Sequence, residues 1–166
     1  MANLSSFVHY ACGLINFDTK GADDLPLLLQ EFVKFCESYN KISDYYLIGH
    51  DDTDVIHIHF IFFSYSQVQL MTYFNKLRNW FVPKFTRDEY GLQIEKCKSL
   101  NAHLNYIIHQ SKASIDDGKK PYSVEDLVSN LDIDVLESTL QSKKGSCDAY
   151  FLRDAVLDCL NDFELI

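Results

Sequence analysis

The order of apolar patterns along the chain predicts an α+β fold built on an antiparallel sheet. Strand-like segments alternate with amphipathic helical ones, and no internal repeat or low-complexity tract interrupts them. The chain has 166 residues, of which 47% are hydrophobic and 14% aromatic. This is long enough for one well-buried domain, with room for a short helical appendage.

The first two elements are a strand and a helix. Residues 7–15 form a continuous apolar run of strand length, as expected for a strand buried on both faces. Asp23 and Asp24 then offer side-chain oxygens for a helix N-cap, and Pro26 suits a first turn. Apolar residues at helical spacing continue to Tyr39, so a helix is expected here.

A hairpin and a second helix follow. Residues 45–50 and 55–63 read as two strands joined by the acidic loop 51–54. Ser66 and Gln69 match a capping box, which predicts a helix that ends before Pro83.

A fourth strand and a third helix complete the pattern. Residues 92–95 alternate between apolar and polar, and residues 99–112 have helical periodicity. The first six elements have the split βαβ order of ferredoxin-like folds, an antiparallel sheet with its helices on one side. Beyond the loop 116–121 only helical patterns occur, the clearest at 152–163. We therefore expect a domain at residues 1–122 and a helical C-terminal extension at 123–166.

The net charge of −9 is unevenly distributed. Residues 123–166 contain ten acidic and three basic residues, whereas residues 1–122 contain fourteen and twelve. The acidity therefore belongs mainly to the C-terminal extension, and the first 122 residues could still present a basic face. Charge neither supports nor excludes DNA binding.

Cellular context follows from what the sequence lacks. The five cysteines are scattered without Cys-x-x-Cys spacing, which argues against a disulfide framework or a zinc knuckle. No apolar run approaches the roughly 20 residues that span a bilayer. We expect an intracellular, cytoplasmic protein with no membrane partner.

The most informative stretch is His57-Ile58-His59, inside an apolar run. Residues two apart on a strand share one face, so both imidazoles project together. Neutral imidazoles on a rigid strand suit a divalent metal, although a plain histidine pair on a half-buried strand has the same pattern. If the hairpin loop is 51–54, His50 pairs with Val55 and falls on the same face. Three imidazoles and a nearby carboxylate would then form a site for Mn²⁺ or Mg²⁺.

Tyr106 lies on the polar side of the expected helix 99–112, nearly opposite its apolar face. A tyrosine in this position is either an ordinary exposed residue or a nucleophile activated by a metal or base. His109 would lie one turn further along the same helix, close enough to assist the phenol.

These motifs resemble the HUH endonucleases that initiate rolling-circle replication, and most closely the small plasmid Rep initiators. That family carries Tyr-Leu-Thr-His, an acidic residue, Ser and Lys on its catalytic helix, similar to residues 106–112 here. The similarity continues through Lys119-Lys120-Pro121-Tyr122 and into Asn130-Leu131-Asp132-Ile133-Asp134. His50-Asp51 resembles the upstream His-Asp of the family. The shorter hairpin loop here points to a viral or satellite relative of the plasmid group.

The resemblance implies a metal-dependent, sequence-specific nicking and joining enzyme for single-stranded origin DNA. Tyr106 would form a 5′-phosphotyrosine and release a 3′-OH that primes synthesis. His57, His59 and His50 would hold the cation, and His109 would orient the phenol or shuttle its proton. Lys112 and Tyr122 would contact DNA, although Tyr122 is equally explained as a loop aromatic that packs on the sheet.

The sequence leaves several candidates for the fourth metal ligand. The family places an acidic ligand three residues after the upstream His, where this chain has Thr53. A shift of one residue gives that role to Asp54, while Asp51 and Asp52 are further candidates. Further expected partners are host replication proteins, and a second copy of the chain through the C-terminal helices.

Two other functions fit parts of the pattern. A non-catalytic module on the same sheet could bind single strands by stacking bases on Phe60, Phe62 and Tyr65, although core packing also explains the first two. A single-tyrosine transposase or relaxase would keep the chemistry, but the similarity at residues 130–134 disfavours it.

Overall fold

The computed structural model describes residues 3–17, 24–51, 55–81 and 91–141. Its elements, in chain order, are β1 (Phe7–Asn16), α1 (Leu25–Ser38), β2 (Asp44–His50), β3 (His57–Gln69), α2 (Leu70–Phe81), β4 (Leu92–Lys96), α3 (Leu100–Ile107), α4 (Lys112–Asp116), the 3-10 helix η3 (Val124–Asp126), β5 (Val128–Ser129) and α5 (Ile133–Gln141). The predicted α+β class is confirmed.

The strands form one five-stranded antiparallel sheet in the order β4-β1-β3-β2-β5. The sequence did not predict β5, a two-residue strand that pairs with β2 at Tyr46 and Leu47. Asn130 extends this edge: its side chain accepts a hydrogen bond from the Tyr45 amide and donates one to the Ser43 carbonyl. The Asn at the start of the 130–134 motif therefore fastens the chain to the sheet.

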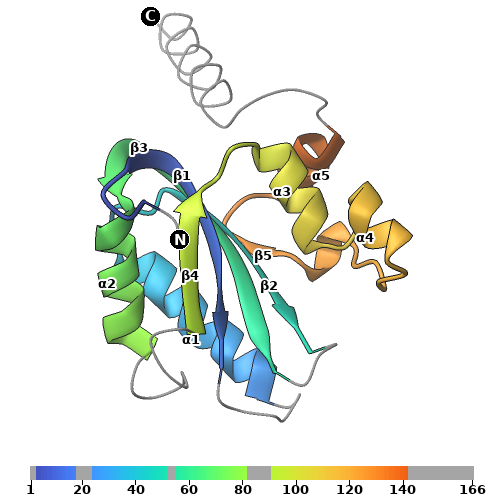
Figure 1. Ribbon diagram of the computed structural model, residues 1–166, viewed down its shortest axis with the longest axis horizontal. Coiled ribbons are helices and arrows are strands. Elements are labelled where there is room, and N and C mark those ends of the chain that lie inside the picture. Colours follow the sequence, from blue (N-terminus) through green and yellow to red (C-terminus); the bar gives the residue numbers. More distant parts are fainter. Residues whose placement is uncertain (1–2, 18–23, 52–54, 82–90, 142–166) are drawn as a thin grey trace, which may run out of the picture.

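A core lies on each face of the sheet. On one face α1 and α2 cover an aromatic cluster that includes Phe32, Phe60, Phe62 and Phe81 (Figure 1). On the other face α3 and the segments that follow it cover a second cluster, which includes Ile48 and Leu104. Strands β2 and β3 contribute residues to both clusters, because successive side chains on a strand point to opposite faces of the sheet.

The β2–β3 register differs from the expected one. His50 pairs with His57 rather than with Val55, and Ile48 pairs with His59. Residues 51–56, rather than 51–54, therefore separate the paired ends of the two strands. The shift is two residues, an even number, so every side chain keeps the face that alternation predicts.

Two helix boundaries also differ. Residues 66–69 belong to β3, whose end pairs with the start of β1, so the predicted capping box at Ser66 and Gln69 is wrong. Pairing with β1 outweighs the local capping preference, and α2 begins only at Leu70. The third predicted helix, 99–112, ends at Ile107, for a reason that concerns the site.

Residues 123–141 continue the packing of the second core. Val124, Leu127, Leu131, Leu136 and Leu140 all belong to or pack against its cluster. The domain boundary expected at residue 122 stays a prediction, and the apolar stripe at 152–163 lies outside the described residues. Within the described part of the chain, no helix is long and apolar enough to cross a membrane. Cys12, Cys36 and Cys97 are buried, and no disulfide joins them to one another within the described residues.

Candidate metal centre

Three histidines meet where β2 ends and β3 begins. His50 and His57 are directly opposed across the two strands, and His59 lies two residues further along β3 on the same face. One ring nitrogen of each lies within 4.8 Å of one from each of the others. His50 and His59 are buried, whereas His57 is half-buried. The predicted grouping of the three imidazoles is therefore present.

Hydrogen bonds fix the tautomers of two of these rings. His50 Nε2 lies 2.7 Å from the carbonyl oxygen of Ile107, and His57 Nδ1 lies 3.0 Å from that of Val55. A carbonyl only accepts, so each of these nitrogens carries the proton. In the neutral rings, Nδ1 of His50 and Nε2 of His57 then carry the lone pairs. A ring nitrogen that donates to a carbonyl is the usual support for a metal-bound histidine.

The third ring is held neutral. Burial, together with a smaller contribution from the neighbouring histidines, lowers the pKa of His59 from 6.5 to about 2. An imidazolium cannot ligate a cation, so an environment that excludes the proton favours the ligating form. Three imidazoles are a donor set that suits a transition-metal ion. The cluster could thus hold a metal ion.

The candidates for a fourth ligand all come from the segment that directly follows His50. Asp54, the expected fourth ligand, lies outside the described residues, as do Asp52 and Thr53. Asp51 directly follows β2 and is exposed. All four stay candidates.

Tyr106 sits beside the cluster on α3. Leu100, Leu104 and Ile107 of this helix are buried, whereas Tyr106 is 45% exposed. Its ring centroid lies 6.2 Å from that of His59 in an edge-to-face arrangement. The helical period correctly placed Tyr106 off the apolar face, and the sheet places it next to the histidines.

The sequence predicted that His109 lies one helical turn beyond Tyr106, and this prediction is wrong because α3 ends at Ile107. The helix α3 ends in a Schellman motif, in which the amides of His109 and Gln110 donate to the carbonyls of Tyr106 and Asn105. His109 occupies the left-handed position of this motif, with φ of 58°, where glycine is usual. The Ile107 carbonyl, which an α-helix would offer to the residue 111 amide, instead accepts from His50.

This turn carries the His109 ring into the core behind the cluster. The ring is 5% exposed, its centroid lies 4.5 Å from that of His50, and its Nδ1 donates to the Lys120 carbonyl at 3.0 Å. His109 therefore supports His50. No glycine, asparagine or proline marks the helix end in the sequence, so pattern reasoning had no signal for it.

Tyr122 also packs on His50. The two rings are stacked at 4.9 Å with an interplanar angle of 3°, and the Tyr122 amide donates to the Ile108 carbonyl at 2.8 Å. Tyr122 therefore reaches the site, in contact with a histidine. Lys112 is exposed at the start of α4, and its contact with DNA stays a prediction.

A residue that the sequence analysis did not single out is His103, one turn before Tyr106 on α3. The rings of these two residues lie 5.6 Å apart. His103 is three residues before Tyr106 on α3, so the helical period places both on the same side of the helix. This spacing is the sequence pattern from which a position beside Tyr106 can be predicted for His103.

Comparison with known proteins adds no relative: the chain matches no protein-family model, and no curated protein is detectably similar to it. The motif residues and the geometry of the site are therefore the basis on which a function is inferred.

Proposed function

We propose that the protein is a metal-dependent nicking and joining enzyme for single-stranded DNA, of the kind that initiates rolling-circle replication. The observation that carries the proposal is the position of Tyr106, exposed on α3 and 6.2 Å between ring centroids from His59. A phenol beside a three-imidazole cluster supplies a nucleophile and a place for a cation, the two groups that a metal-assisted transfer of a phosphodiester to tyrosine would use.

The reaction exchanges one ester bond for another. The Tyr106 oxygen attacks phosphorus, the bond from phosphorus to the 3′ oxygen breaks, and the 5′ phosphate stays on the tyrosine. The phenolic proton is lost as the new bond forms, and the departing 3′ oxygen takes up a proton to become the 3′-OH. Reversal with another 3′-OH joins the strands and releases the tyrosine.

His50, His57 and His59 would hold the cation, which supplies polarisation of the phosphate and offsets its developing charge. Three imidazole donors favour Mn²⁺ over Mg²⁺, because Mg²⁺ prefers oxygen ligands. His109 and Tyr122 support the site through their contacts with the His50 ring. We assign His109 the role of a positioning residue, since its Nδ1 is committed to the Lys120 carbonyl.

The fold is compatible with this function. The strand order β4-β1-β3-β2, with α1 and α2 on one face, supports a ferredoxin-like arrangement of the HUH type. The site lies on the opposite face, beside α3. This function implies three partners for a plasmid- or virus-encoded protein: origin DNA, host replication proteins, and a second copy of the chain joined through the C-terminal extension at 123–166.

The alternative of a non-catalytic binding module loses most of its basis. Phe60 and Phe62 have no exposed surface and pack under α1 and α2, as the core explanation predicted. Of the three aromatic residues proposed for stacking, only Tyr65 is exposed. A base-stacking sheet needs several exposed aromatics along one strand path.

Cleavage tests the proposal. The purified protein is incubated with a labelled pool of random single-stranded oligonucleotides and Mn²⁺, and adducts are resolved on a denaturing gel. We expect a covalent adduct that disappears with chelator and in Tyr106→Phe, but persists in Tyr65→Phe, which removes a hydroxyl from an exposed tyrosine elsewhere on β3. An adduct that is insensitive to chelator, or equal in Tyr106→Phe, would overturn it.

A further inference from the structure

A cavity lies beside Tyr106, on the side of this residue that faces the N-terminus of α3. It has a volume of about 320 Å³ and opens between α3 and the edge strand β4. Its lining includes Cys12, Glu95, Lys98, Ser99, His103 and Tyr106. This volume is at the small end of ligand sites, which measure roughly 300–1,000 Å³.

Strand register places this cavity on the same sheet face as the histidines. Cys12 pairs with Glu95 on one side and with Ile61 on the other, one row away from Leu14, which pairs with His59. Cross-strand partners share a face, so Glu95 projects toward α3 and away from the aromatic core. Tyr106 therefore lines the cavity and also lies beside His59, and both sites are on the same face of the sheet.

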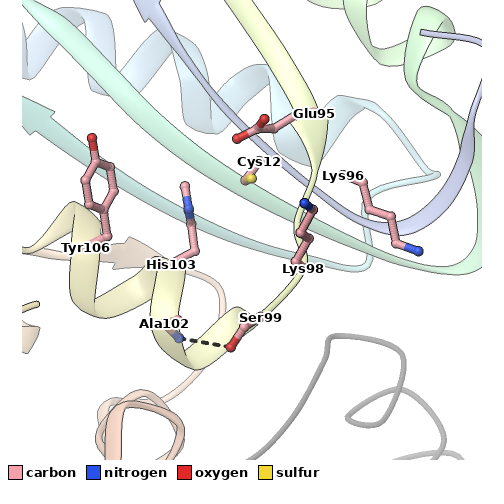
Figure 2. A pocket seen from close by; sticks show the side chains of 8 residues that line it. All are labelled: Cys12, Glu95, Lys96, Lys98, Ser99, Ala102, His103 and Tyr106. Carbon is pink, nitrogen blue, oxygen red and sulfur yellow. Dashed lines mark hydrogen bonds between the residues drawn. The ribbon is translucent and has the colours of Figure 1, made fainter. Parts of the chain in front are cut away.

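The polar groups of the cavity are of mixed charge. In Figure 2 the Glu95 carboxylate and the His103 ring both point toward the space above Cys12, and the Lys98 amine extends toward the same region. Nε2 of His103 is buried without a hydrogen-bond partner among the described residues. A simple anion site would not include a carboxylate, so the lining favours a neutral ligand with donors and acceptors side by side.

We propose that this cavity receives the base of one of the two nucleotides that share the scissile phosphate, and that it selects guanine. The inference rests on the proposed function. Adjacent N1–H and N2–H donors of guanine match the two oxygens of the Glu95 carboxylate, and its O6 acceptor matches the Lys98 ammonium. Cytosine and adenine offer the carboxylate only their exocyclic amine, and thymine only one ring N–H. The exposed ring of Tyr106 borders the same space and gives the base an aromatic contact.

One experiment reads the specificity of cleavage. Adducts formed with the random pool are recovered and sequenced for the wild type, Glu95→Gln, Lys98→Met and the control Glu137→Gln, an exposed carboxylate on α5. We expect guanine to be enriched at least tenfold next to the nick in the wild type and the control. Glu95→Gln should reduce that enrichment by at least fivefold at that position alone, and Lys98→Met should weaken it. No preference next to the nick, or a preference unchanged in Glu95→Gln, would overturn the proposal.

A second experiment does not require nicking. Metal-free protein is titrated with dGMP, dIMP and dCMP while the NMR signals of the His103 and Tyr106 rings are followed. Wild type should bind dGMP at least fivefold more tightly than dIMP, which lacks the N2 amine, and Glu95→Gln should bind the two equally. Equal binding of all three nucleotides by the wild type contradicts guanine selection. Guanine selectivity without any adduct would leave this site standing and reject the nuclease.

Discussion

His50 donates a hydrogen bond of 2.7 Å from Nε2 to the backbone carbonyl of Ile107. The last residue of β2 thereby holds the last turn of α3, the helix that carries Tyr106. One side chain thus links the candidate metal cluster to the candidate nucleophile, since its other ring nitrogen is the one that can ligate. The bond also explains why α3 ends where it does.

Replacing His50 should therefore have two effects where replacing His57 has one. His50→Ala removes a ligand and leaves the carbonyl of the buried Ile107 without its donor, which costs about 1–3 kcal/mol in addition to lost packing. His57→Ala removes a half-buried ring whose hydrogen bond, within the described residues, is to the carbonyl of Val55, two positions away. We expect both variants to lose at least tenfold in Mn²⁺ affinity by calorimetry. In urea unfolding of the metal-free protein, only His50→Ala should lose more than about 2 kcal/mol. Equal stabilities would show that the bond does not hold the helix.

The backbone of His109 offers a test with an unusual sign. Its φ of 58° is left-handed, which costs a residue with a Cβ about 1–2 kcal/mol and glycine almost nothing. Both His109→Ala and His109→Gly lose the ring and its bond to Lys120. His109→Gly should therefore be more stable than His109→Ala by about 1 kcal/mol in denaturant unfolding. The reverse order, usual inside helices, would contradict the Schellman ending of α3.

Acid should destabilise the metal-free protein through His59. Its pKa is lowered from 6.5 to about 2 by burial and by the neighbouring histidines. The unfolded chain then binds a proton below pH 6.5 that the folded chain refuses, so stability falls as pH drops through this window. The slope from one such group is about 1.4 kcal/mol per pH unit. The wild type should lose more stability between pH 6.5 and 5 than His59→Gln, and saturating Mn²⁺ should raise its stability at pH 6.5. Parallel curves for the two proteins would refute the assignment.

The C-terminal helix of the described part is tied to α3. The side-chain amide of Asn101 donates hydrogen bonds to the backbone carbonyls of Thr139 and Leu140, at 3.0 and 2.7 Å. Leu136 of α5 is buried in the second core. Because α5 begins at Ile133, we expect a fragment ending at Gln141 to keep its fold and metal binding, and one ending at Asp134 to be several kcal/mol less stable. Equal thermal stability of the two fragments would contradict this.

Strand alternation predicted the histidine site. The hairpin register, the end of α3 and the strand β5 depend on features that alternation and helical periodicity do not report. His57 and His59 share a face because they are two residues apart on one strand, with Ile58 directed to the opposite face. An error of two residues in the hairpin register could not change that face. The turn length itself depends on pairing that no local pattern encodes. The end of α3 depends on a contact between residues 57 positions apart, His50 and Ile107, which a period of 3.6 residues cannot reveal. The edge strand β5 is too short to have a period.

The central claim is that Tyr106 is the nucleophile, and mapping the covalent adduct tests it most directly. Protein incubated with Mn²⁺ and cleavable single-stranded DNA is digested with nuclease and protease, and the nucleotide-bearing peptide is sequenced by mass spectrometry. We predict a 5′-phosphotyrosine at Tyr106, which is 45% exposed beside His59, and none in the presence of chelator. A phosphotyrosine at Tyr122, whose ring is stacked on His50, or at any other tyrosine would contradict the account.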